Sequence, residues 1–94
     1  MTIKDLQPAE VFGIFHEITQ VPRPSKKEGK IRKYLLDFAA KHNLEVQTDE
    51  IGNVVMRKPA TPGHEDAPGI IMQAHMDMVC ESNHKGFDFE NQPI

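Results

Sequence analysis

The sequence predicts an α/β protein in which two amphipathic helices precede three short strands. Two observations support this class. In the first 42 residues, apolar side chains recur with the spacing of one helix face. After that point, apolar residues alternate with polar ones or form short runs, as is typical of strands. The order of two helices and then three strands is typical of a layered α/β architecture.

The first helix is marked by four apolar residues at positions i, i+3, i+4 and i+7, which are Val11, Ile14, Phe15 and Ile18. Pro8 suits its first turn, where the missing proline N–H costs no hydrogen bond. Residues 21–24 contain two prolines, and a residue before proline avoids the helical region. We therefore expect the helix to end before this segment.

A second helix is predicted to open at Ser25, because Ser25 and Glu28 have the spacing of a capping box. An apolar stripe follows at helical spacing, formed by Ile31, Leu35, Phe38 and Ala39. We expect this helix to end at His42 and Asn43. A histidine is favourable near a helix C-terminus, and asparagine tolerates the left-handed conformation that ends many helices.

Three strands are predicted in the rest of the chain. Residues 44–48 alternate and residues 54–56 are apolar, with the turn signal Gly52-Asn53 between them, so we expect a hairpin. Residues 59–69 are rich in proline and glycine and predict an exposed loop. Residues 70–74 form a continuous apolar run, typical of a strand covered on both faces. Such a strand needs neighbours, so residues 1–94 are interpreted as the opening part of a domain.

Composition excludes several classes of protein. The chain has 94 residues and a formal net charge of −3, which gives no reason to expect binding to nucleic acid or to an anionic membrane. No apolar run approaches the roughly 20 residues that span a bilayer, and the start lacks the pattern of a signal peptide. Cys80 is the only cysteine. Because no intrachain disulfide can form, a reducing, cytoplasmic location is predicted.

The chemistry is concentrated in residues 69–79, where an apolar run ends in His75 and Asp77. In an extended segment these two side chains point to the same face, and Met76 points to the other. A metal-ligating histidine commonly donates its second ring N–H to a carboxylate or a carbonyl, which fixes its tautomer. His75 is therefore a candidate metal ligand, and Asp77 is its candidate orienting partner.

Longer stretches around this pair resemble a known family. They include Gln-Ala-His-Met-Asp-Met-Val-Cys-Glu-Ser-Asn at 73–83, Phe-Asp-Phe at 87–89, Pro-Ile at 93–94, Val-Pro-Arg-Pro-Ser at 21–25 with Glu28, and Asp-Glu-Ile-Gly-Asn-Val at 49–54. The resemblance is to the zinc-dependent exopeptidases, which include carnosinases, peptidase T and aminoacyl-histidine dipeptidases. It covers nearly all of the chain in order. It implies that residues 1–94 are the N-terminal portion of a mixed-sheet catalytic domain.

The resemblance implies a two-metal site in the intact protein, with His75 as a ligand of one Zn²⁺ and Asp77 as a catalytic residue that holds the imidazole. An N/O site of this kind also accepts Co²⁺ or Mn²⁺. The family's bridging aspartate, general-base glutamate and other ligands have no matching positions here, so the 94 residues alone are expected to be inactive. The implied substrates are dipeptides, including Xaa-His, and an inserted domain often used for homodimerisation lies outside this chain.

The remaining reactive residues are interpreted as structural. Four histidines lie on a polar helix side, near a helix end or in loops: His16, His42, His64 and His84. Cys80 is predicted to be a small, buried or half-buried residue. The basic residues between 26 and 33 predict a solvated helix face, because aromatic residues are scarce among them. Three methionines are predicted to fill the core around the third strand: Met72, Met76 and Met78.

An alternative reading from a different class stays open. If residues 1–94 were a complete product, three strands would leave an open sheet edge with unpaired backbone groups. The chain would then be a small non-catalytic protein that binds a partner through that edge. A naturally terminated sheet is expected to carry charge, proline or a bulge on its last strand, whereas residues 70–74 carry only apolar and amide side chains.

Overall fold

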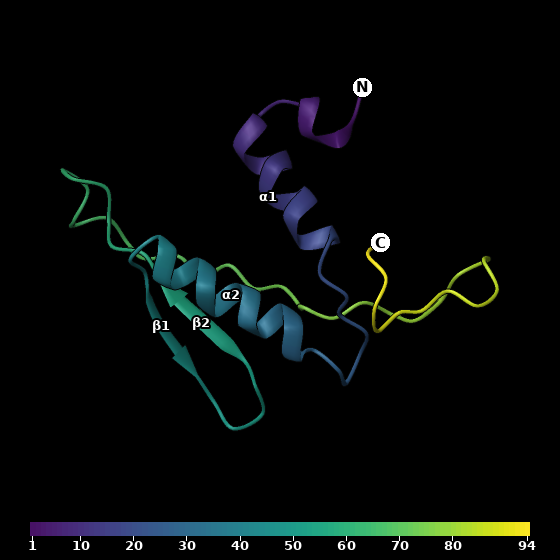
Figure 1. The fold of residues 1–94 in the computed structure, drawn as a ribbon. Helices are drawn as coiled ribbons and strands as arrows, with labels where there is room; N and C mark the ends of the chain where they lie inside the picture. Colours follow the sequence, from purple (N-terminus) through teal and green to yellow (C-terminus); the bar gives the residue numbers. More distant parts are fainter. The chain divides into compact units, whose positions relative to one another are not determined.

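The computed structural model describes all 94 residues, which form two compact units. The first unit contains residues 1–31 and 76–94, and the second contains residues 32–75. The elements in order are the 3-10 helix η1 (Ile3–Asp5), the helices α1 (Ala9–Thr19) and α2 (Gly29–Lys41), and the strands β1 (Glu45–Thr48) and β2 (Val54–Arg57) (Figure 1). The predicted α/β class is confirmed. No helix has the length and apolar character needed to cross a membrane.

Helix α1 forms where the sequence predicts it. It follows Pro8 and ends at Thr19, and the N–H of Gln20 donates to the carbonyl of Glu17 at 3.1 Å. Its apolar stripe is only partly covered in this chain, because Val11 and Phe15 are 59% and 48% exposed. The helical periodicity therefore identifies the element correctly, although these 94 residues cover that face only in part.

Helix α2 begins at Gly29, four positions after the predicted capping serine. The predicted capping box is wrong. The Glu28 carboxylate accepts instead from the N–H of Lys26 at 2.7 Å, and Lys26 has a φ of 70°. A positive φ excludes a right-handed helix at that residue, so the helix starts only after it. The hydroxyl of Ser25 donates to a carboxylate elsewhere in the chain.

The predicted end of α2 is confirmed. Asn43 has a φ of 55°, in the left-handed region that asparagine tolerates. The N–H of Leu44 donates to the carbonyl of Ala39 at 2.8 Å, and that of Asn43 donates to Ala40 at 3.3 Å. These two bonds form the Schellman motif, which satisfies carbonyls that a helix end otherwise leaves unpaired. On the covered face of α2, Ile31 and Ala39 are 2% and 0% exposed.

The hairpin is confirmed as an antiparallel pair, with Glu45 opposite Arg57 and Thr48 opposite Val54. Figure 1 shows β1 and β2 as adjacent arrows that run in opposite directions. The turn between them is organised by Asp49. One oxygen of its carboxylate accepts from the N–H groups of Gly52 and Asn53, both at 2.9 Å, and the other accepts from the Asn53 amide at 2.7 Å. Gly52 has a φ of 109°, which a side chain rarely permits.

The predicted third strand is wrong. The sheet has two strands, and residues 70–74 take no part in it. A strand is stabilised by ladder hydrogen bonds to a neighbour, and residues 70–74 have none in this chain. Ile70, Ile71 and Met72 are consequently 85%, 96% and 88% exposed. The Pro/Gly-rich loop before them is exposed, as predicted.

Candidate functional site

The candidate site forms where two distant segments of the first unit meet. Pro24 and Met78 form an isolated parallel β-bridge. The N–H of Met78 donates to the carbonyl of Arg23 at 2.8 Å, and the N–H of Ser25 donates to the carbonyl of Met78 at 3.1 Å. Residues 23–25 and 77–78 therefore lie side by side. This pairing places the side chain of Asp77 beside that of Ser25.

The carboxylate of Asp77 accepts a hydrogen bond from the Ser25 hydroxyl, with 2.5 Å between Oγ and Oδ2. The same hydroxyl lies 3.2 Å from the carbonyl oxygen of Met78. A serine hydroxyl has one proton to donate. A bond to an ionised oxygen is shorter and stronger than one to a neutral carbonyl, so the proton is directed at Asp77.

Arg23 anchors this junction to helix α1. Its side chain is 8% exposed, and its Nη1 atom donates to the carbonyl of Ile18 at 2.7 Å and to that of Val21 at 3.3 Å. These carbonyls lie at and just after the end of the helix, where a cation is favourable. Burial lowers the pKa of the Arg23 guanidinium, because it disfavours the charged form. The segment beside Asp77 is thus fixed to a helix end.

The two sequence-predicted site residues differ in their surroundings. Asp77 is half-buried in the first unit, whereas His75 is exposed and is the last residue of the second. No three His, Cys, Asp or Glu side chains gather closely enough to hold a metal ion. An imidazole nitrogen and a carboxylate are donors that zinc accepts, but a catalytic zinc normally has three protein ligands. The donor set of this chain therefore fits part of a zinc site.

The other candidates take structural positions. The ring centroids of His42 and Phe38 lie 4.3 Å apart, and His64 and His84 are in exposed loops. The prediction that Cys80 is buried or half-buried is wrong, because it is exposed. The prediction of core methionines fails at Met72, whose strand does not form, whereas Met76 and Met78 are half-buried.

The chain is 36% identical over 93 residues to the cytosol non-specific dipeptidase of Escherichia coli K12, an alignment that covers 98% of this chain and 19% of that protein. It superimposes with a TM-score of 0.93 and 39% identity on the crystal structure of aminoacylhistidine dipeptidase from Vibrio alginolyticus, covering 100% of this chain and 19% of that one. The resemblance read from the sequence is confirmed.

A further relative extends the similarity to another kind of peptidase. A probable carboxypeptidase of Uncinocarpus reesii is 27% identical over 86 residues, which cover 81% of this chain and 19% of that protein. No family model matches the chain. The chain spans about one fifth of the length of aminoacylhistidine dipeptidase and of these relatives. The α/β arrangement of two helices and a two-stranded sheet is therefore that of a segment of a dipeptidase domain.

Within this dipeptidase-like segment, sequence reasoning missed the role of Ser25. The spacing to Glu28 favoured a helix cap, and nothing local to Ser25 indicates a carboxylate 52 positions away. The signal that points to Ser25 is the resemblance itself, which includes the Pro-Arg-Pro-Ser stretch. That stretch carries the buried arginine and the hydroxyl that together define the surroundings of Asp77.

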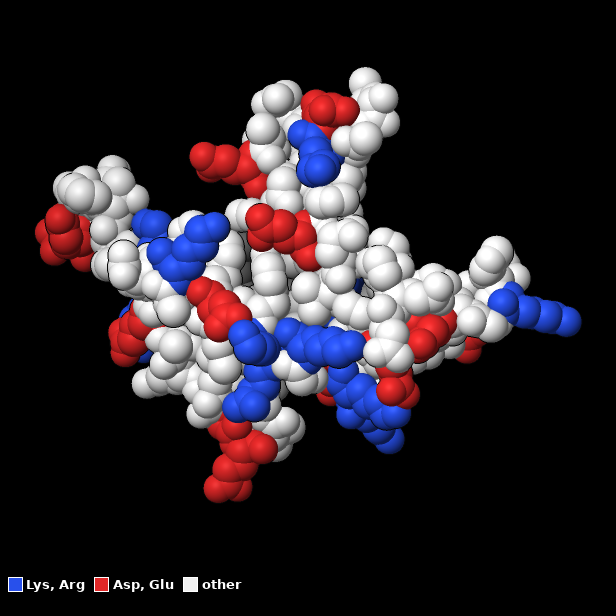
Figure 2. Space-filling model, viewed as in Figure 1, with Lys and Arg blue, Asp and Glu red and all other residues white.

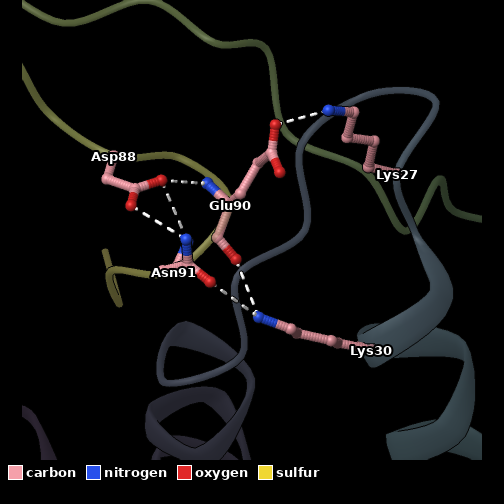
Figure 3. A network of polar contacts seen from close by, with 5 residues as sticks. All are labelled: Lys27, Lys30, Asp88, Glu90 and Asn91. Carbon is pink, nitrogen blue, oxygen red and sulfur yellow. Dashed lines mark hydrogen bonds and ion pairs between the residues drawn. The ribbon is translucent and has the colours of Figure 1, made fainter.

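A second polar network lies in the same unit and joins the start of α2 to the C-terminal residues (Figure 3). The ammonium of Lys27 pairs with the Glu90 carboxylate, which raises the pKa of Lys27. Lys30 donates to the backbone carbonyl of Glu90 at 2.8 Å. The Asn91 amide donates to Asp88 at 2.9 Å, and this bond is the largest cause of the lowered pKa of Asp88. These contacts fix residues 88–91, which follow Asp77 in the chain, to the start of α2.

Two of the basic residues near the start of α2 have acidic partners, whereas the prediction of a solvated face fails at Arg32, which is half-buried. Lys33 pairs with Asp37 one turn along the helix, at 2.7 Å, and Lys27 pairs with Glu90. On the face shown in Figure 2, Lys and Arg side chains stand among Asp and Glu side chains. Charges paired in this way are typical of a solvated helix face. The absence of nucleic-acid binding stays a prediction.

Proposed function

We propose that residues 1–94 are the N-terminal portion of a dipeptidase catalytic domain, and that the intact protein hydrolyses dipeptides. The observation that carries the proposal is the match to aminoacylhistidine dipeptidase over the whole chain, at 39% identity and a TM-score of 0.93. The names of the relatives support a peptidase. Xaa-His dipeptides are the proposed substrates, since one matched protein is named for that class. A cytoplasmic location and a homodimer are part of the same proposal.

The residues of this chain have defined parts in the proposed reaction. His75 would bind one Zn²⁺ through its imidazole, and Asp77 would orient that imidazole by accepting its other ring N–H. A two-metal site supplies a Lewis acid for the peptide carbonyl and a water of lowered pKa. Further ligands and a general base are proposed to come from outside residues 1–94, because this chain gathers fewer than three ligand side chains. Co²⁺ or Mn²⁺ would suit the same donor types.

The test starts with the intact mass of the protein as its own cell produces it, followed by assays on that purified protein. We expect a mass several times 10.7 kDa and hydrolysis of Xaa-His dipeptides that a chelator abolishes and Zn²⁺ restores. His75→Ala should remove activity, because a metal ligand is lost, whereas His64→Ala, in an exposed loop, should not.

Two results would contradict the proposal. A mass near 10.7 kDa would favour the alternative, a small protein that binds a partner through an open sheet edge or through the exposed residues 70–72. A long product with no zinc-dependent dipeptidase activity would reject the activity while leaving the fold assignment intact.

A further inference from the structure

The donor to Asp77 is held in place by more than its own side chain. The backbone N–H of Ser25 donates to the carbonyl of Met78, and the N–H of Met78 donates to the carbonyl of Arg23. The guanidinium of Arg23 is buried against carbonyls at the end of α1. Serine has a single side-chain torsion before its oxygen, so a fixed backbone leaves the hydroxyl few positions. The hydroxyl is therefore preorganised toward Oδ2 of Asp77.

A carboxylate that orients a metal-bound histidine must itself be held. The partners beyond a metal's direct ligands fix the ligand's orientation, and their loss typically costs 10–100-fold in metal affinity or activity. Ser25 acts on the carboxylate of Asp77 through the 2.5 Å contact to Oδ2. This contact limits rotation of the carboxylate about its last torsion, which is otherwise broad.

We propose that Ser25 is a positioning residue for Asp77, and that its hydroxyl fixes the orientation in which this carboxylate serves His75. The inference rests on the proposed function, since it takes Asp77 to be the partner of a zinc ligand. The competing reading is that the hydroxyl only fastens residues 23–25 to residues 77–78. That reading predicts a loss of stability without a specific loss of zinc affinity or turnover.

The experiment compares Ser25→Thr with Ser25→Val in the protein at its natural length. Threonine and valine have nearly the same shape, so the pair isolates the hydroxyl. Ser25→Ala removes the hydroxyl without adding a methyl group. Ser82→Ala is the matched control, because Ser82 is the other serine of the chain and its hydroxyl accepts only a loop N–H, from His84 at 3.0 Å. The readouts are the zinc dissociation constant by chelator competition, kcat, KM and thermal unfolding.

We expect Ser25→Val and Ser25→Ala to weaken zinc binding and to lower kcat by about threefold to tenfold. This is less than the 10–100-fold typical of a metal ligand's direct partner, because Ser25 acts on that partner and not on the ligand. KM should stay within about twofold, because substrate contacts are untouched. Ser25→Thr should restore most of both quantities. Ser82→Ala should match the wild type.

Equal zinc affinity and kcat in the Val and Thr variants would overturn the inference, even if both variants are less stable. Inactive wild-type protein that binds no zinc would instead overturn the proposed function, and this inference with it. The two failures are distinguishable, because the first requires an active, zinc-binding wild type.

Discussion

At the scale of single residues, Arg23 combines burial with charge. A buried cation is costly unless its donors are satisfied, and two backbone carbonyls accept from its Nη1 atom. Arg23 also contributes its own carbonyl to the bond with Met78. One residue thus links the end of α1, through its side chain, to the segment that carries Asp77, through its backbone carbonyl.

Arg23→Ala is expected to lower the free energy of unfolding of the natural-length protein by about 2 kcal/mol, the usual range for hydrogen bonds to a charged group. The physical reason is that the partly buried carbonyl of Val21 loses its side-chain donor, while that of Ile18 loses the charged donor and keeps the N–H of Val21 at 3.1 Å. Denaturant unfolding measures the change. Arg57→Ala, at an exposed strand end, should cost less than about 1 kcal/mol. Equal losses in the two variants would contradict this account.

The residue scale also shows what the sequence could and could not predict about the site. His75 and Asp77 stand out because both reactive types follow one apolar run. Ser25 does not stand out, since a serine three positions before a glutamate has a simpler reading as a helix cap. The Ser25 hydroxyl could either cap a helix or bond to a distant group, and in the structure it donates to a carboxylate 52 positions away. Local sequence patterns carry no information about such long-range contacts.

At the scale of elements, the turn between β1 and β2 is ordered by a carboxylate. Asp49 accepts from the backbone of Gly52 and Asn53 and from the Asn53 side chain. These donors lower the pKa of Asp49, and the Asn53 side chain is the largest cause. Because the folded pKa lies below the unfolded one, the stabilisation is complete above the unfolded pKa. It is lost as the pH falls through the folded pKa.

Asn53→Ala is expected to raise the pKa of Asp49 toward its ordinary value, because the largest stabilising donor is removed. The acid-dependent loss of stability that the turn causes should then be smaller. Carboxyl-carbon NMR titration of Asp49 measures the pKa directly. Asn83→Ala, in an exposed loop, serves as the control. An unchanged Asp49 titration in Asn53→Ala would show that the backbone donors alone set the pKa.

Elements were predicted well where their stabilising contacts are local. Helix α1, the end of α2 and the hairpin depend on spacing, on Asn43 and on the Gly52-Asn53 turn, all of which are visible in the sequence. The predicted strand at residues 70–74 depends on neighbours, and the only strands in this chain pair with each other. The apolar content of this segment alone led to the prediction that it is buried. That prediction is wrong in this chain, because Ile70, Ile71 and Met72 are exposed.

At the scale of the whole molecule, the chain carries more apolar surface than its own elements cover. Val11 and Phe15 on α1 and the run at 70–72 are largely exposed. Within each unit, neighbouring apolar side chains that are exposed in this way mark places where other chain segments or partners pack. The chain also covers only about 19% of the dipeptidases that it matches. Both observations are expected of one part of a larger dipeptidase domain.

The 94 residues alone are expected to hydrolyse no Xaa-His dipeptide, even with Zn²⁺ present. The physical reason is that no three ligand-type side chains gather in this chain, so zinc would be held weakly and without a general base. A discontinuous assay of released histidine at several zinc concentrations measures this, with the natural-length protein as the positive control. Clear zinc-dependent turnover by the 94 residues would show that no ligand or general base from outside this chain is needed.

The bond between Ser25 and Asp77 has a consequence for biosynthesis. The two residues are 52 positions apart, and a ribosome adds about 5–20 residues per second. The serine therefore waits roughly 3–10 seconds, by the same rates, before its carboxylate partner has been made. During that interval α2 and the hairpin can form from local contacts, whereas the junction cannot. The surroundings of Asp77 are thus completed after α2 and the hairpin, and slowing synthesis between these positions would delay the junction while leaving the earlier elements unaffected.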